Sequence, residues 1–101
     1  MTDLSVKTGI AWMRKAYDET FAACVEAGEY AIAAKREATE AALQNLPTLG
    51  SKAEISQYIA CIAWLHGRKL IEPEESKAHM YIAQLALAAL EPSYARKQAS
   101  K

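Results

Sequence analysis

Residues 10–45, IAWMRKAYDETFAACVEAGEYAIAAKREATEAALQN, decide the fold of this chain. Ten residues of this stretch follow one another at intervals of three or four: Ile10, Met13, Tyr17, Thr20, Cys24, Ala27, Ala31, Ala34, Ala38 and Ala41. Residues at this spacing share one face of an α-helix. The stretch therefore predicts a long helix whose inner face narrows from large side chains to alanine, so that a neighbouring helix can approach its second half closely.

Gly28 leaves the continuity of this helix open. A glycine inside a helix costs roughly 1 kcal/mol relative to alanine, and an unbroken helix of ~50 Å is longer than a compact domain needs. A second apolar stripe of Phe21, Val25, Gly28 and Ile32 lies about 100° from the first. From the two stripes we expect residues 21–34 to pack against two other helices.

Two further helices follow the break at Pro47, which cannot supply a helical backbone donor. Ser51 and Glu54 form a predicted capping box, and the helix that they start, about 52–66, is apolar nearly all round. It is the expected central helix, with Gly67 as its left-handed end.

The last helix, about 73–91, begins with Pro73 and two acids, which suit a helix N-terminus. Met80 and Leu87 are expected to lie off its inward face. The residues predicted to form that face are Ala78, Tyr81, Ile82, Leu85, Ala89 and Leu90.

These patterns predict an all-α fold, a compact bundle of three helices (about 9–45, 52–66 and 73–91), or of four if the first breaks at Gly28. The 21 alanines agree with this, because alanine is the best helix former. We expect a single domain over 1–101, with a frayed lead-in (1–8) and tail (92–101). No apolar run reaches the length that a membrane span requires.

Net charge and cysteine content limit the classes of function to be considered. The formal net charge is zero, so the strong basic excess of a nucleic-acid binder is missing. Cys24 and Cys61 lie within helical pattern and are expected to be buried free thiols, which together with the missing secretory leader predicts a cytoplasmic protein.

Signals for chemistry are weak. Glu75 and His79 share a helix face, as two metal ligands could, but no complete metal motif accompanies them. The two cysteines lack the basic surroundings of a nucleophilic thiol. We therefore predict no catalytic residue, no metal and no cofactor, and we do not expect an enzyme.

Candidate binding residues are more informative. Trp12 lies between positions of the apolar face, and an exposed tryptophan is a common anchor of protein interfaces; the alternative is that it packs under one of the chain ends. The turn after the central helix is a second, basic candidate, with an ordinary solvated turn as its alternative. The predicted partner-binding residues are Trp12, Lys15, Glu19, Glu26, Tyr30, Arg68 and Lys69.

No family resemblance is specific enough to name. The sequence leads us to expect a stoichiometric protein-binding module that acts by steric occlusion. It would be a small adaptor or an inhibitor of a larger complex, for instance one encoded by a phage or mobile element against a host defence complex. One alternative is a structural homo-oligomer, possible as a homodimer, that uses the alanine-rich face. Another is a helix-turn-helix-like nucleic-acid binder, which the acids at 72, 74 and 75 disfavour because they would face phosphates.

Overall fold

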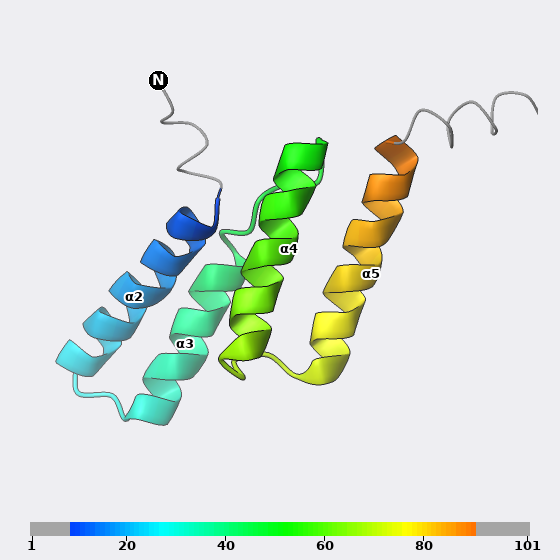
Figure 1. Cartoon of the computed structure of the whole chain (residues 1–101). Coiled ribbons are helices and arrows are strands. Elements are labelled where there is room, and N and C mark those ends of the chain that lie inside the picture. The colour runs from blue at the N-terminus through cyan, green and yellow to red at the C-terminus, as the bar shows by residue number, and fades with distance from the viewer. Residues whose placement is uncertain (1–8, 91–101) are drawn as a thin grey trace, which may run out of the picture.

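The computed structural model describes residues 9–90, and within that range the chain forms four α-helices and no strand. The helices are α2 (Ile10–Glu26), α3 (Ala31–Leu43), α4 (Lys52–Gly67) and α5 (Pro73–Leu90). Successive helices run in opposite directions, so α2 with α3 and α4 with α5 form two antiparallel hairpins (Figure 1). Helix α4 also packs on α2. The predicted all-α bundle is confirmed, with the four helices expected if the first one breaks. The predicted lead-in and tail lie outside the described residues.

The predicted first helix ends just before Gly28, whose φ is +94°. The backbone N–H of Gly28 donates to the Val25 carbonyl and that of Glu29 donates to the Cys24 carbonyl, both at 3.0 Å. These two bonds around a left-handed residue form a Schellman motif, a common helix ending that favours glycine. The alternative of one continuous helix over 10–45 is therefore wrong.

The apolar pattern with its spacing of three and four continues across the break at Gly28. The part on α2 and the part on α3 both face the inside of the α2–α3 hairpin. Met13 and Tyr17 on α2 are buried, as are Ala34 and Ala38 on α3. The small alanine side chains let the two helices approach closely, and α2 and α3 make the most extensive helix–helix contact in the described range. One periodic pattern thus supplies the two sides of one interface.

The second predicted stripe is largely exposed. Val25 is 48% exposed and Ile32 is 74% exposed, while Phe21 packs partly against the core. The prediction that residues 21–34 pack against two helices is wrong because it assumed a continuous helix. Once the chain turns at Gly28, Val25 and Ile32 lie at the outer end of the hairpin.

Helix α4 lies at the centre of the bundle, as its sequence predicts, and contacts both α2 and α5. Ile55, Ile62 and Leu65 are fully buried in the core. Burying an aliphatic side chain of this size stabilises a fold by about 1.5–3 kcal/mol relative to leaving it exposed. These three residues are therefore major contributors to holding the two hairpins together.

The start of α4 uses the predicted cap in a modified form. The backbone N–H of Glu54 donates to the Ser51 hydroxyl at 3.2 Å. The Glu54 carboxylate accepts from the backbone N–H of Gly50 at 3.1 Å, one residue earlier than in a standard capping box. Ser51 and Glu54 still satisfy two backbone donors that the helix cannot.

The end of α4 differs from the prediction. Gly67 belongs to the helix, and the left-handed residue is Lys69, with a φ of +60°. The backbone N–H of Lys69 donates to the His66 carbonyl and that of Leu70 donates to the Leu65 carbonyl, both at 2.9 Å. This is a second Schellman motif, formed with lysine in place of glycine.

The predicted inward face of α5 is wrong. Tyr81, Ile82 and Leu85 are 62%, 47% and 54% exposed, whereas Met80 and Leu87 pack against the core. Helix α5 carries apolar residues on two faces, and periodicity alone cannot tell which one meets α4. Apolar as α5 is, no helix within residues 9–90 has the length and hydropathy needed to cross a membrane.

The start of α2 depends on a distant residue. Gly9, which precedes the helix, provides no side-chain cap. The backbone N–H of Ile10 instead donates to Oε1 of Gln57 on α4, at 3.0 Å. Helix α2 is therefore fixed at its first turn by the neighbouring hairpin.

Candidate functional site

Three of the predicted binding residues come together on α2. Trp12, Lys15 and Glu19 line a shallow pocket of about 270 Å³. Nε1 of Trp12 donates to Oδ1 of Asn45 at 3.0 Å, and Lys15 Nζ lies 5.5 Å from the centroid of the Trp12 ring. Lys15 Nζ also lies 3.9 Å from the Glu19 carboxylate. Trp12 is only partly exposed, and its hydrogen bond to Asn45 links α2 to the segment just after α3. Neither interpretation of Trp12 from the sequence included this role.

The other four predicted residues lie at the end of the bundle that carries both hairpin turns (Figure 1). Glu26 and Lys69 are exposed, and Tyr30 is 88% exposed. The Arg68 guanidinium lies 4.7 Å from the centroid of the Trp64 ring, which is cation–π distance. Arg68 therefore has a partner within the fold, whereas Tyr30 is directed to solvent.

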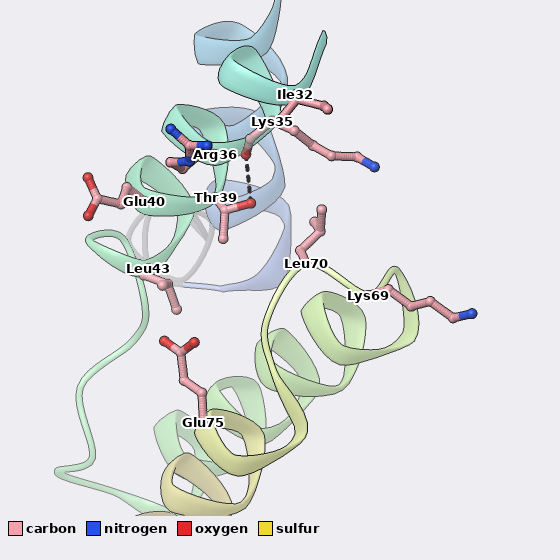
Figure 2. A pocket seen from close by; sticks show the side chains of 9 residues that line it. All are labelled: Ile32, Lys35, Arg36, Thr39, Glu40, Leu43, Lys69, Leu70 and Glu75. Atoms are coloured by element: carbon pink, nitrogen blue, oxygen red, sulfur yellow. Dashed lines mark hydrogen bonds between the residues drawn. The ribbon is translucent and has the colours of Figure 1, made fainter.

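A pocket of about 380 Å³ lies between α3 and the α4–α5 turn, beside Lys69 (Figure 2). The Leu43 and Glu75 side chains point toward each other across it, and the Lys35 and Lys69 side chains extend away from it. Charges of both signs surround the opening, because Arg36 and Glu40 also line it. This mixture does not favour one class of ligand.

The outer side of α5 presents an apolar surface that the sequence assigned to the core. It consists of the exposed residues Ala78, Tyr81, Ile82, Leu85 and Ala89, here called the α5 stripe. Their spacing places them on one helix face. Between Met80 and Leu90 the only polar residue is Gln84.

A helix that is apolar all round is normally covered all round. Helix α5 makes an extensive contact with α4 and with no other described helix. The α5 stripe is therefore an apolar surface that no described helix covers. The sequence reveals these residues by their periodicity, but it does not reveal that they face outward.

The α4–α5 pair does not have helix-turn-helix geometry. Its helices lie side by side and antiparallel (Figure 1), whereas the DNA-binding motif crosses its helices at about 90–120°. Glu72, Glu74 and Glu75 are exposed around the start of α5. Both observations add to the argument from charge against this alternative.

Glu75 and His79 are the pair that the sequence suggested as possible metal ligands. In the structure His79 contacts both Tyr58 and Glu75. Nδ1 of His79 shares a hydrogen bond with the Tyr58 hydroxyl, and its Nε2 lies 3.9 Å from the Glu75 carboxylate. Burial raises the pKa of Tyr58 above its ordinary value, so the hydroxyl stays protonated. The three side chains connect α4 to α5 without forming a site open to a ligand.

Both cysteines are buried free thiols, as predicted. Burial raises the pKa of the Cys61 thiol to about 11. For Cys24, burial is the largest cause, and the neighbouring carboxylates of Glu37 and Glu29 add to it, raising its pKa to about 11. At neutral pH neither sulfur is the thiolate that a nucleophile requires.

Comparison with known proteins does not extend these observations. No protein-family model matches the chain, and no match is found among curated proteins or among solved structures.

Proposed function

We propose that this chain is a non-enzymatic, stoichiometric protein-binding module that docks its partner through the α5 stripe. The observation that carries the proposal is the exposure of Tyr81, Ile82 and Leu85 on adjoining turns of one helix face. Contiguous exposed apolar residues mark interaction sites in many soluble proteins. Since about half of each side chain is exposed, covering it would contribute roughly 1 kcal/mol per residue.

The charges at the start of α5 favour a partner other than a second copy. Glu74 and Glu75 occupy the first turn of α5 and are exposed. The helix contains one lysine, Lys77, and no arginine, so a second α5 offers few groups to pair with these acids. The expected partner surface is an apolar helix face or groove with basic residues at one end.

The surfaces favoured by the sequence are less suited to the centre of an interface. Trp12 and Arg68 each have a partner within the chain. The alanine-rich face required by the homo-oligomer alternative is also in use, because Ala34 and Ala38 are buried between α2 and α3. A homo-oligomer would need another surface, of which the α5 stripe is one.

Steric occlusion is the mechanism that fits such a module. By covering an apolar surface of its partner, the chain would act as an adaptor or as an inhibitor of a larger complex. A phage or mobile-element inhibitor of a host complex is one example of that class. The support for this class is the shape and composition of α5 alone.

The test is a pull-down from a lysate of the producing cell with the wild-type chain, Leu85→Glu and Gln84→Glu. The two variants add the same charge to neighbouring exposed residues, but only Leu85 belongs to the α5 stripe. We expect one protein to be recovered at near-stoichiometric yield by the wild-type chain and Gln84→Glu, and to be lost with Leu85→Glu.

Two results would contradict the proposal. One is recovery of no protein at near-stoichiometric yield by the wild-type chain. The other is a dimer in light scattering that Leu85→Glu dissociates, which would assign the α5 stripe to a second copy. Circular dichroism of both variants checks that their helices are intact.

A further inference from the structure

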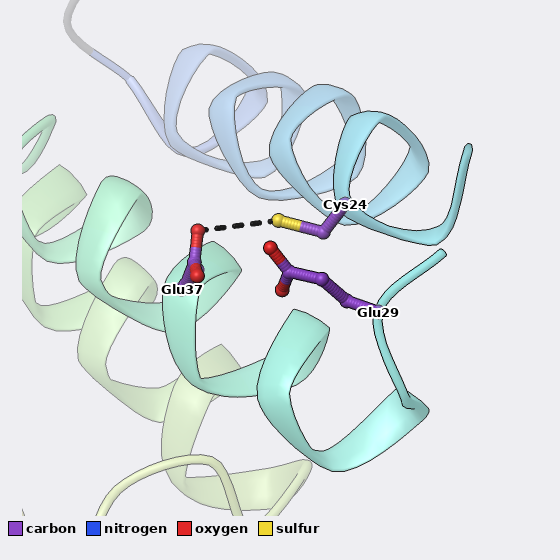
Figure 3. A group of neighbouring side chains, drawn as sticks. All are labelled: Cys24, Glu29 and Glu37. Carbon is purple, nitrogen blue, oxygen red and sulfur yellow. Dashed lines mark hydrogen bonds between the residues drawn. The ribbon is translucent and has the colours of Figure 1, made fainter. Parts of the chain in front are cut away.

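Three metal-ligating groups converge where α2 ends and the chain turns back into α3 (Figure 3). Cys24 lies in α2, Glu29 lies in the turn, and Glu37 lies on α3. One ligand atom of each, the Cys24 sulfur and a carboxylate oxygen of each glutamate, lies within 4.8 Å of the other two. The three residues line a surface pocket of about 380 Å³, so an ion has access from solvent.

The backbone of the turn fixes two of these groups in place. In a Schellman motif the third-last residue of the helix and the third residue after the helix end come together, usually through an apolar contact. In the α4–α5 turn these positions hold Leu65 and Leu70. In the α2–α3 turn they hold Cys24 and Glu29, whose backbones share the 3.0 Å hydrogen bond of the motif. The same geometry therefore pairs a thiol with a carboxylate.

Hydrogen bonding within this cluster is incomplete. The Cys24 thiol has one proton, which it donates to Oε1 of Glu37 at 3.3 Å. Oε1 of Glu29 is buried and has no hydrogen-bond partner. The Glu29 carboxylate points toward the Cys24 sulfur (Figure 3). An unpaired buried polar atom of this kind costs about 1–3 kcal/mol, and more when it is charged.

Among the described residues, no ion pair compensates the two carboxylates. Across residues 9–90, neither Glu29 nor Glu37 forms an ion pair with a lysine, arginine or histidine. The last turn of α2 contains no basic residue, although the negative end of the helix dipole favours one there. The converging ligand atoms and the unpaired negative charge thus both favour a bound cation.

We propose that Cys24, Glu29 and Glu37 bind a divalent cation of the zinc type. A thiolate ligand favours zinc over magnesium or calcium, and carboxylates complete many zinc sites. Zinc lies ~2.0–2.3 Å from such ligands, so the ligand atoms of a tetrahedral zinc site are ~3.5 Å apart. The three ligand atoms lie within 4.8 Å of one another here, so they would move closer together on binding. Zinc binding releases the thiol proton to solvent, and the pocket leaves the fourth position open to water.

The experiment uses the full chain titrated separately with Zn²⁺ and with Co²⁺, which reports its ligands by absorption. We expect one zinc per chain and a thiolate-to-cobalt charge-transfer band that Cys24→Ala abolishes. Changes outside the ligand shell already weaken zinc sites by about 10–100-fold, so Glu37→Gln and Glu29→Gln should each weaken binding by about tenfold or more.

Matched controls separate the site from nonspecific binding. Cys61→Ala removes the other thiol, and Glu26→Gln removes an exposed carboxylate from the same end of α2. Both should keep the cobalt band and the zinc affinity of the wild-type chain. The two glutamine variants retain side-chain shape at partly exposed or exposed positions, so they are expected to fold even if Cys24→Ala does not.

The proposal is overturned if the wild-type chain binds no stoichiometric zinc. It is also overturned if the cobalt band persists in Cys24→Ala, or if Glu26→Gln weakens binding as much as Glu37→Gln does. Zinc binding is independent of the α5 stripe, so Leu85→Glu should leave it unchanged whether or not a protein partner is found.

Discussion

The two hairpins turn by the same backbone motif but differ in what they bury and what they present. The α2–α3 hairpin places Gly28 at the left-handed position, and the α4–α5 hairpin places Lys69 there. The first hairpin is closed over alanines, such as Ala34 and Ala38. The second is closed over larger side chains and leaves the α5 stripe exposed.

This comparison shows that turn geometry and surface chemistry are set by different residues. Backbone hydrogen bonds fix both turns in the same form. The side chains on either side of each turn then decide its chemistry. The α2–α3 turn carries a cluster of acids and a thiol, and the α4–α5 turn carries an apolar contact. The turn of the first hairpin carries carboxylates without a described ion pair. The second hairpin has an apolar surface, the α5 stripe, that no described helix covers.

The largest expected effect distinguishes the two sides of the second hairpin. Leu65→Ala should lower the free energy of unfolding by about 2–5 kcal/mol, because Leu65 is fully buried and its loss leaves a cavity. Leu85→Ala should change it by less than about 1 kcal/mol, because more than half of Leu85 is exposed. Urea denaturation of both variants measures the difference. Equal losses would mean that the α5 stripe is buried within the chain.

A smaller effect tests the close packing of the first hairpin. Ala38→Leu should destabilise the protein by about 1–3 kcal/mol, because the added atoms have no space between α2 and α3. Ala63→Leu makes the same change at an exposed position of α4 and should stay within about 0.5 kcal/mol. Thermal and urea unfolding compare the pair. A tolerated Ala38→Leu would contradict a tightly packed interface.

The smallest effects come from exchanging the turn residues. Gly28→Ala should cost about 1–2 kcal/mol through backbone strain alone, since the added methyl group would meet no atom within 4 Å. Lys69→Gly should stabilise the protein, by about 1 kcal/mol at most, because the released strain outweighs the added freedom of the unfolded chain. The urea midpoint of unfolding is therefore expected to fall for Gly28→Ala and to rise for Lys69→Gly. Shifts in the same direction for both variants would show that the two turns are not equivalent.

Local signals in the sequence predicted much of this fold. The Ser51 cap, Pro47 and Pro73 each act on their own neighbours, so the starts of α4 and α5 follow closely from them. The break at Gly28 remained open because a glycine costs a helix only roughly 1 kcal/mol, which tertiary packing can offset. Whether the chain turns there depends on the rest of the bundle.

The contacts made at the candidate sites depend on tertiary structure and were missed for that reason. Trp12 meets Asn45 only because α3 returns antiparallel to α2. Cys24, Glu29 and Glu37 form no recognisable spacing until the turn at Gly28 is known. Helix α5 has two apolar faces of similar strength, and the choice between them is made by side-chain packing on α4, which periodicity does not contain.

The bond between the Ile10 amide and Gln57 has a consequence for how the chain folds. A helix nucleates at a cost, and its first amides have no acceptor within the helix itself. For α2 one of those acceptors comes from α4, a residue 47 positions away, so the first turn gains it only after the second hairpin has docked. Two hairpins that could each form from local contacts are thereby joined into one cooperative unit, in which partial unfolding of either one weakens the other.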